Sequence, residues 1–491
     1  MIGLIQTFFD SLNNGNIRYC HWKSNINLRE MLAGETDIDL LVDRRDTEFF
    51  MSLIAALHFK MAKPPPSEEV RSVCHYFGLD EATGSLVHLH VYYRIVTGGS
   101  LLKNYCLPLE EMLLENAHLC HGVKVPSKAA ELGLYVIRKT LEHVALIEII
   151  LLHREGSLRR ELDWLLYPGA DKEAAALLLR WLPAIDTNIF MESLDALKNS
   201  GSLLNRYLVA RRMRKCLSGF TKYGILKAFY TRQIKLLKKV YMKLFGKKAL
   251  TLFTGGAKIA IVGADATGKS TVHNEISKWL SEHFMVMRVH TGRPPATFLT
   301  FVPNIVIPFL RKALPGYRTL KVKKYLQEKD TSRPSGALRL FVFAVRSLMV
   351  AYDRRSLLKK ISRKAAVGAI VVCDRYPSYV AGAMDSSAMD ESETPEGRFR
   401  LISRLIRLEN SIYRMMPPPD IVIHLFVPVD VALKRNVLRN KKDTEDDDYV
   451  RRRHIQSAKQ SYITQCAYRF DTSSTLEETI LQIKMAIWKC L

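Results

Sequence analysis

The sequence lacks the patterns that mark membrane, secreted and zinc-ribbon proteins. No uncharged apolar run reaches the roughly eighteen residues that a spanning helix needs, so we predict none. The start, MIGLIQTFFDSLNNG, carries an early acid but no basic n-region or small-residue cleavage site, so we predict no signal peptide. Eight cysteines are scattered without a C-x-x-C pair, which favours reduced thiols in a cytoplasmic protein over a disulfide framework or a zinc site.

Acidic residues are missing from one long stretch, between Asp195 and Asp265, although the chain contains 49 of them. Much of the net charge of +24 lies in this stretch, which predicts an anionic partner. Its basic residues include Arg206, Arg211, Arg212, Arg214, Lys215, Lys222, Lys227, Arg232, Lys235, Lys238, Lys239, Lys243, Lys247 and Lys248.

Within this stretch, TRQIKLLKKVYMKLFGKK predicts an amphipathic helix with Ile234, Leu237, Tyr241 and Leu244 on one face and lysines on the other. Three interpretations stay open: a linker helix packed on a neighbouring domain, a helix lying on an anionic membrane surface through residues 206–248, and a contact with a nucleic-acid backbone. The last is the least favoured, because no base-stacking aromatic pattern accompanies the lysines.

The 491 residues exceed one ordinary core and divide by pattern into four segments. Residues 1–125 alternate short apolar strands with turns, which predicts an α+β domain. Residues 126–204 have helical periodicity, and residues 205–257 form the basic linker. Residues 258–491 alternate strand and helix patterns, which predicts a doubly wound parallel α/β sheet. Its predicted strands are 258–263, 285–290, 369–374, 420–427 and 468–471.

The stretch IAIVGADATGKSTV contains the pattern G-x-x-x-x-G-K-[ST] between an apolar β-branched run and a helix-forming run. Such a loop turns backbone N–H groups toward phosphate, and the next helix presents its positive N-terminal end. We predict ATP with Mg²⁺ here, with Lys269 reaching the β- and γ-phosphates and Ser270 ligating the metal. The predicted binding residues are Gly263, Asp265, Thr267, Gly268, Lys269, Ser270 and Thr271.

Two further segments carry charges suited to phosphoryl transfer. The strand VVCDRYP ends in Asp374, a candidate Mg²⁺ ligand, and Arg375, which is suited to grip a second phosphate bidentately. The segment VALKRNVLRNKKD places Arg435 and Arg439 about one helical turn apart, as expected for a cationic lid over the phosphoryl group.

The motifs of residues 258–491 together resemble the thymidylate kinase family of P-loop nucleoside monophosphate kinases. The shared elements are the P-loop with an acid in its second variable position, VVCDRYP, PPPDIVIHLFVPVDVALKRNVLR and the final FDTSSTLEETILQI. The resemblance implies that Asp374 and Arg375 hold an acceptor phosphate. It also implies a catalytic lid arginine, Arg439 rather than Arg435, because the P-loop has none. Candidates for binding base or phosphate are Arg346, Asp353 and Arg354.

The resemblance does not name the acceptor, because HTGRPPATFLTFVPNIVIPFLRKALPGYR replaces the family segment after the second strand and an acid-rich insert follows the D-R pair.

Residues 1–125 contain a second informative motif, CHWKSN followed by GETDIDLLV. Asp37 and Asp39 stand one residue apart on a predicted strand, so both carboxylates lie on one side of the pleat, as in two-metal nucleotidyl transfer. The pattern resembles the nucleotidyltransferase superfamily, which implies Asp37 and Asp39 as catalytic metal ligands. His88 stands where that family's third acid is expected. Lys23 is either a phosphate ligand or a surface residue, and the D-x-D is either active, retained only for binding, or accidental.

These patterns favour a cytoplasmic, ATP- and Mg²⁺-dependent kinase acting on a nucleoside monophosphate or a related small phosphorylated acceptor. One alternative is an ATP-binding sensing or interaction protein, peripheral at the inner face of the membrane. Another is a nucleotidyltransferase acting through the N-terminal domain. The chain is also a candidate to form a homodimer.

Overall fold

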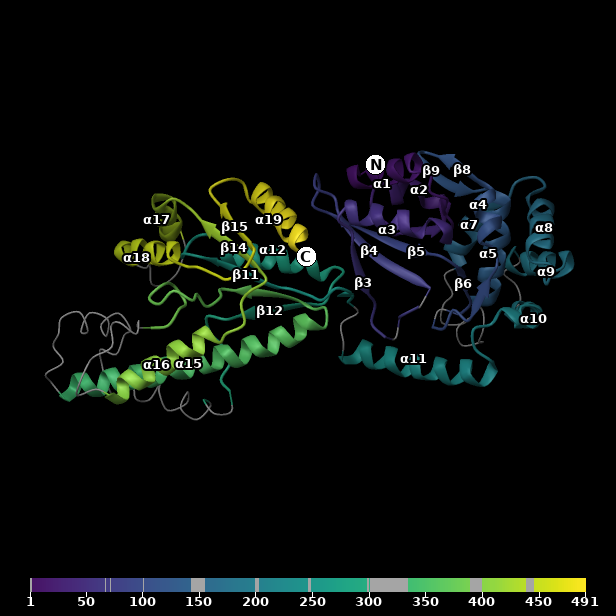
Figure 1. Cartoon of the computed structure of the whole chain (residues 1–491). Helices are drawn as coiled ribbons and strands as arrows, with labels where there is room; N and C mark the ends of the chain where they lie inside the picture. Colours follow the sequence, from purple (N-terminus) through teal and green to yellow (C-terminus); the bar gives the residue numbers. More distant parts are fainter. Residues whose placement is uncertain are drawn as a thin grey trace. The chain divides into compact units, whose positions relative to one another are not determined.

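The computed structural model shows two compact units, Met1–Phe253 and Thr254–Leu491 (Figure 1). It describes residues 2–66, 68–70, 72–99, 101–142, 155–198, 203–245, 249–297, 300, 334–388, 400–438 and 446–491. No helix in these ranges is both long enough and apolar enough to cross a bilayer.

A six-stranded mixed sheet in the order β1-β2-β5-β4-β3-β10 forms the centre of the first unit. Its β2 and β5 run parallel, and the other pairs are antiparallel. The strands are β1 (Tyr19–His21), β2 (Ile38–Val42), β3 (Lys60–Lys63), β4 (Val73–Leu79), β5 (Leu86–Tyr92) and β10 (Thr251–Leu252). Two hairpins join β6 (Ile95–Thr97) to β7 (Tyr105–Leu107) and β8 (Ala117–Cys120) to β9 (Val123–Pro126). The strands predicted around the D-x-D motif and SLVHLHVYY are therefore confirmed as β2 and β5.

Helices complete the first unit through two hydrophobic cores. One core packs α1 and α3 on the sheet through residues such as Phe8 and Phe50. The other joins Trp22, directly after β1, and Tyr92 of β5 to the helical segment around α5 and α8. The predicted helical middle thus shares a core with the sheet. The helices are α1 (Gly3–Asn14), α2 (Leu28–Leu32), α3 (Thr47–Ala56), α4 (Glu110–Glu115), α5 (Lys128–Glu142), α7 (Glu155–Leu165), α8 (Ala170–Trp181), α9 (Thr187–Lys198), α10 (Leu203–Cys216) and α11 (Ile225–Phe245).

The second unit is built on a five-stranded parallel sheet in the order β12-β13-β11-β14-β15. The strands are β11 (Lys258–Gly263), β12 (Val286–His290), β13 (Ile370–Asp374), β14 (Ile421–Phe426) and β15 (Cys466–Asp471). All five predicted strands are confirmed, to within two residues at each end. β11 is central and fully buried, as its apolar β-branched sequence predicts for a strand covered on both faces.

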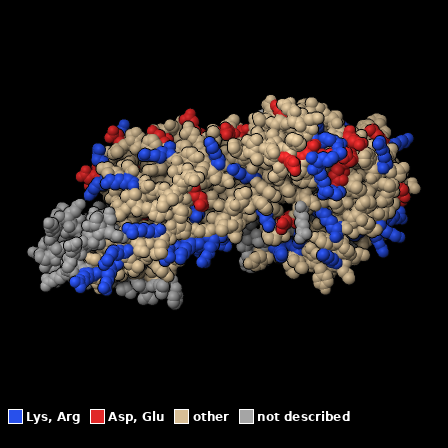
Figure 2. All heavy atoms as spheres, in the orientation of Figure 1, with Lys and Arg blue, Asp and Glu red and all other residues tan. Residues whose placement is uncertain are grey.

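The described helices of the second unit are α12 (Lys269–Ser281), α15 (Pro334–Ala366), α16 (Arg400–Arg414), α17 (Val429–Leu438), α18 (Asp447–Ala458) and α19 (Leu476–Cys490). The helices α15 and α16 pack together and onto the sheet through residues such as Leu358 and Tyr413. The helices α12 and α19 contact each other and the sheet, with the rings of Trp279 and Trp488 6.3 Å apart. Figure 2 shows Lys and Arg side chains along the edge formed by α15 and α16.

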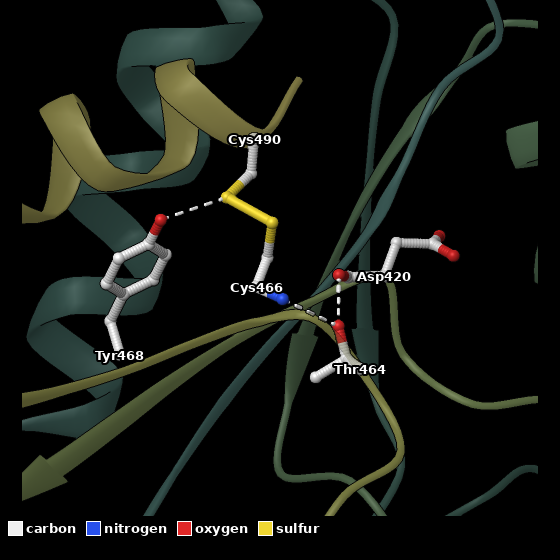
Figure 3. The surroundings of a disulfide bond; sticks show 5 residues. All are labelled: Asp420, Thr464, Cys466, Tyr468 and Cys490. Atoms are coloured by element: carbon white, nitrogen blue, oxygen red, sulfur yellow. Dashed lines mark hydrogen bonds between the residues drawn. A yellow bond between two sulfur atoms is a disulfide. The ribbon is translucent and has the colours of Figure 1, made fainter.

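One prediction about the cysteines is wrong, because Cys466 and Cys490 form a disulfide with Cα atoms 6.3 Å apart (Figure 3). Cys466 begins β15 and Cys490 ends α19, so the return of the helix along the strand brings together residues 24 apart in sequence. Nothing in the cysteine spacing indicates this return. The other six cysteines are free.

Candidate functional site

The P-loop runs from the carboxyl end of β11 into the first turn of α12. Gly263 has φ +146°, and a Cβ there would lie 2.3 Å from the carbonyl oxygen of Leu425. Gly268, directly before α12, has φ +83°, a conformation that glycine adopts without strain. The two glycines of the motif are therefore required by the turn itself. The backbone N–H groups of the loop therefore lie at the positive N-terminal end of α12, where an anion is stabilised.

Lys269 is buried at the start of α12 and donates to the carbonyl oxygen of Ala264. Its ammonium lies 4.0 Å from Asp265 Oδ1. Burial lowers the pKa of Lys269 to about 8, against the opposing attraction of Asp265. A dianionic phosphate beside Lys269 would favour the charged ammonium further.

Asp265 connects the P-loop to two other elements. Its Oδ1 pairs with Arg375 Nη2 at 3.2 Å, and its Oδ2 accepts from Arg453 Nε on α18 at 3.2 Å. His454, next on α18, lies 3.2 Å from the Asp265 carbonyl oxygen. Burial opposes ionisation of Asp265, but the charges of Lys269, Arg453 and Arg375 hold its pKa below the ordinary value. The sequence did not predict that α18 contributes Arg453 and His454 to this site, because neither residue belongs to a phosphate-binding motif.

Asp374 ends β13 beside the P-loop, as predicted. Its Oδ2 lies 3.7 Å from His290 Nδ1, whereas its Oδ1 is buried without a hydrogen-bond partner. A buried carboxylate oxygen without a partner is costly unless a ligand satisfies it. The Ser270 hydroxyl and the Asp374 carboxylate are hard oxygen donors of the kind Mg²⁺ takes. These residues therefore fit the predicted metal.

A polar cavity of about 230 Å³ brings these groups together. The predicted residues Asp265, Lys269, Ser270, Asp374 and Arg375 line it, with His290 and Arg293, which the sequence did not single out. The cavity lies at the carboxyl ends of β11, β12 and β13, where parallel sheets bind ligands.

Arg375 is fixed between two acids on the wall of this polar cavity. Its Nη1 lies 3.4 Å from Asp385 Oδ2, and its backbone has φ +70°. Behind it, Arg354 donates to the Tyr413 hydroxyl at 2.6 Å and lies 3.7 Å from Asp385 Oδ1. Arg354 therefore helps to fix the position of Asp385, which in turn pairs with Arg375.

The other candidates on the same helix are placed differently. Asp353 accepts from the hydroxyls of Thr297 and Thr300 at 2.8 and 2.7 Å. These bonds tie α15 to the segment after β12. Arg346 lies in α15 and contacts other residues of the protein.

A second cavity, of about 440 Å³, lies beside the P-loop and is lined by Gly268, Thr271, Arg435, Thr472 and Ser474, among others. Arg435, which the sequence predicted to lie in a lid, donates from Nη2 to the Thr472 carbonyl oxygen at 2.6 Å and so holds the segment after β15. Arg439 lies outside the described residues.

Thr267 is buried in the loop, where its hydroxyl donates to the Ala264 carbonyl oxygen at 2.9 Å. Its own carbonyl oxygen accepts from Thr472 Oγ1 at 3.1 Å. The side chain of Thr267 therefore shapes the loop, whereas Thr271 lines the larger cavity.

The D-x-D carboxylates of the first unit are already paired. Lys23 Nζ lies 2.7 Å from Asp39 Oδ1, and it also donates to the Tyr92 hydroxyl at 3.1 Å. Despite burial, the charge of Lys23 and the hydrogen bond from His90 lower the pKa of Asp39 far below its ordinary value. Lys23 is therefore the counter-ion of Asp39, rather than the surface lysine that the sequence left open.

The strand register places His88 beside the D-x-D motif. Asp39 pairs with His90 across parallel strands β2 and β5, which places His88 opposite Asp37. His88 Nδ1 lies 2.9 Å from Asp37 Oδ1, and His90 Nδ1 lies 3.3 Å from Asp39 Oδ1. His75 joins them from β4, with its Nδ1 3.2 Å from His88 Nε2. The H-x-H alternation of β5 was a visible signal for His90, but His75 required the sheet order.

A buried polar network holds the loop that carries Lys23. Asn25 donates to Glu131 of α5 from its backbone at 3.1 Å and from Nδ2 at 2.7 Å, and it lies 2.6 Å from His21 Nδ1. Burial raises the pKa of Glu131 to about 7. Ser24, at the turn of this loop, has φ +58°.

Comparison with known proteins finds similarity over part of the chain. No family model matches the chain. The uncharacterized ATP-binding protein YghR, from two Escherichia coli strains (K12 and O6:H1), is 25% identical over 193 residues, which are 38% of this chain and 72% of that protein. The solved thymidylate kinase of Candida albicans covers 48% of this chain and 92% of its own, at 16% identity and a TM-score of 0.26.

The geometry of the second unit is that of a nucleotide-binding P-loop on a parallel α/β sheet. The loop, its lysine and the strand-end carboxylate meet at one cavity. The first unit offers a separate cluster of carboxylates and imidazoles.

Proposed function

We propose that the unit Thr254–Leu491 is an ATP- and Mg²⁺-dependent phosphotransferase acting on a nucleoside monophosphate or a related small phosphorylated acceptor. The observation that carries this proposal is the pair of cavities that share the P-loop. Ala266 lines both of them. One loop is thus flanked by two spaces, as a reaction between a nucleotide donor and a second substrate requires.

The larger cavity suits the nucleoside part of the donor. It follows the first turn of α12 and includes Ser474, whose hydroxyl offers a hydrogen bond to ribose or base. ATP as the donor is supported by the name of the Escherichia coli relatives. The donor phosphates would lie on the backbone of residues 263–270 against Lys269.

The polar cavity suits the acceptor phosphate. Arg375 and Arg293 line it, and a guanidinium binds phosphate through two parallel N–H donors. An acceptor phosphate oxygen attacks the γ-phosphorus, and the bond to the β–γ bridging oxygen breaks, so that ADP leaves with the electron pair. The attacking oxygen is already anionic, so no general base is needed.

Electrostatic stabilisation is what the residues of the polar cavity can supply. Lys269 and Arg375 face the charge that spreads over the transferring group. Ser270 and Asp374 would hold Mg²⁺, which neutralises charge on the donor phosphates when bound. Arg453, attached to Asp265, brings a third cation to the P-loop from α18.

The test is ADP release by the purified full-length chain with ATP, Mg²⁺ and a panel of nucleoside monophosphates, nucleosides and sugar phosphates. Lys269→Ala should reduce acceptor-stimulated ADP release by about 10³-fold or more. Without nucleotide, the variant should fold as the unmodified chain does. Lys278→Ala, at an exposed lysine on the same helix, is the matched control and should retain full activity. Full activity of a folded Lys269→Ala protein would refute the proposal.

A second candidate function, attachment to an anionic membrane surface, is favoured by α11. Its apolar side chains are exposed on the first unit, with Ile225 at 90%, Leu226 at 79% and Tyr230 at 69%. Its lysines include Lys227 and Lys238, and no acid occurs between Asp195 and Asp265. Exposed apolar groups beside lysines match an interface of acyl chains and anionic headgroups.

Co-sedimentation of the full-length chain with vesicles measures this attachment. We expect binding to vesicles that contain phosphatidylglycerol and little binding to pure phosphatidylcholine, with a loss at high salt. Replacing Leu226 and Tyr230 by Ser should weaken binding about tenfold or more, because each buries apolar area in the interface. Leu179→Ser, at an exposed leucine of α8, is the control. Equal binding by both variants would refute attachment through α11.

A further inference from the structure

The sheet of the first unit carries three histidines whose ligand atoms converge. His75 on β4 and His88 and His90 on β5 each offer one ring nitrogen, and these nitrogens all lie within 4.8 Å of one another. The two strands pair antiparallel, with His75 opposite His90. The cluster is therefore built by neighbouring strands of one rigid sheet, and its spacing does not depend on a loop.

The spacing of this cluster matches coordination by a small cation. The distance between His75 Nδ1 and His88 Nε2 is 3.2 Å. Two nitrogen ligands of a tetrahedral zinc ion, each at about 2.0–2.1 Å, lie roughly 3.3 Å apart. The His90 ligand nitrogen lies within 4.8 Å of those of His75 and His88, so a movement of this side chain toward the other two would bring it into the same coordination shell.

The ring orientations are fixed by groups behind the cluster. His88 Nδ1 lies 2.9 Å from Asp37 Oδ1, and the His88 ring stacks on Phe77 with centroids 4.1 Å apart. His90 Nδ1 lies 3.3 Å from Asp39 Oδ1. A carboxylate on the far nitrogen of a histidine orients the ring and raises its basicity, which is the usual support of a metal-binding imidazole.

The same carboxylates are poorly available to Mg²⁺. Lys23 is 2.7 Å from Asp39 and neutralises it, and the remaining acid, Asp37, faces two imidazoles. Mg²⁺ demands hard oxygen ligands in near-octahedral geometry, whereas imidazole suits Zn²⁺ and similar transition-metal ions. The chemistry of the donors thus differs from that of an acidic nucleotidyl-transfer site.

We propose that His75, His88 and His90 form a binding site for one Zn²⁺-like transition-metal ion, with Asp37 and Asp39 as outer-sphere supports. Three protein ligands leave the fourth position of a tetrahedral ion for water or a substrate oxygen. The site is independent of the ATP chemistry proposed for the second unit.

The test uses Zn²⁺ and Co²⁺ as probes on the purified full-length chain after chelation and dialysis. We expect one ion per chain, a visible Co²⁺ spectrum of four-coordinate nitrogen ligation, and retention of Zn²⁺ in a large excess of Mg²⁺. Stoichiometry below one half, a six-coordinate Co²⁺ spectrum, or displacement by Mg²⁺ would overturn the proposal.

Single variants locate the ion. His75→Ala and His88→Ala should each weaken Zn²⁺ binding about 100-fold or more, whereas His118→Ala, at an exposed histidine of β8, should leave it unchanged. Undiminished binding in both cluster variants would place the ion elsewhere and overturn the proposal. Circular dichroism of each variant without metal reports folding, and the Co²⁺ spectrum of the unmodified chain tests the site even where a variant is unstable.

Discussion

The first unit places Asp37 and Asp39 at the start of β2, the second unit places Asp374 at the end of β13, and the two units treat these carboxylates in opposite ways. In the first unit, Asp39 is paired with Lys23 and Asp37 with His88. In the second, Asp374 keeps one buried oxygen without a partner. A paired carboxylate has already lost much of its attraction for a cation, whereas an unpaired one gains from binding a cation. In the second unit, aspartate is therefore placed to bind a hard cation directly. In the first unit, the aspartates instead support histidine side chains.

The largest effect that separates the two sites concerns Asp374. Asp374→Asn keeps the shape but removes the charge, so we expect acceptor-dependent ADP release to fall about 100-fold, with saturation requiring more Mg²⁺. A steady-state titration of Mg²⁺ measures both quantities. Asp37→Asn is the matched variant in the first unit and should leave the Mg²⁺ dependence unchanged. An equal loss in both variants would mean that the two units act on one reaction.

A second effect, on stability rather than activity, concerns Glu131, which supports the Lys23 loop through Asn25. Its folded pKa of about 7 lies above its ordinary value of 4.5, so the folded protein keeps a proton that the unfolded chain releases. This group's contribution to stability is complete below pH 4.5 and is lost as the pH rises through 7. Over this window it removes about 3 kcal/mol from the free energy of unfolding.

Glu131→Gln cannot titrate, so it should flatten this dependence. Urea unfolding of the two proteins between about pH 4.5 and 8 measures the difference, with Glu115→Gln, at an exposed glutamate of α4, as the control. Parallel pH profiles for Glu131→Gln and the unmodified chain would contradict the raised pKa.

The smallest expected effect concerns the contact between α18 and the P-loop. Arg453→Met removes the cation on Asp265 Oδ2. We expect about a tenfold fall in kcat/KM for ATP, because a hydrogen bond between charged groups contributes about 1.5–3 kcal/mol. The adjacent Arg452→Met is the control, since Arg452 is exposed and its Nε donates to the Asp448 carbonyl oxygen of its own helix. A larger loss in the control would show that α18 acts through its stability alone.

Local pattern was sufficient for much of the fold. The five strands of the second unit and β2 and β5 of the first follow from short apolar runs, and the P-loop follows from glycine spacing. Asp374 and Arg375 were found because the strand and its end are contiguous in sequence.

Other residues of the sites depend on tertiary contacts that no local pattern encodes. Arg453 reaches Asp265 from 188 residues away. His75 meets His88 only because β4 and β5 are neighbours in the sheet. The Cys466–Cys490 pair likewise depends on how α19 returns along β15. Segments distant in sequence thus supply the residues that sequence analysis missed.

The junction between the units has a mechanical consequence. Phe253 donates to Met61 in the first unit at 2.9 Å, and Gly256 donates to Ala365 in the second at 2.8 Å. Only Thr254 and Gly255 separate these anchors, and two residues span at most about 7 Å. Gly255 has φ +103°, which a side chain would disfavour. A Cβ at Gly255 would meet no atom within 4 Å, so Gly255→Ala would strain only the backbone of this two-residue link.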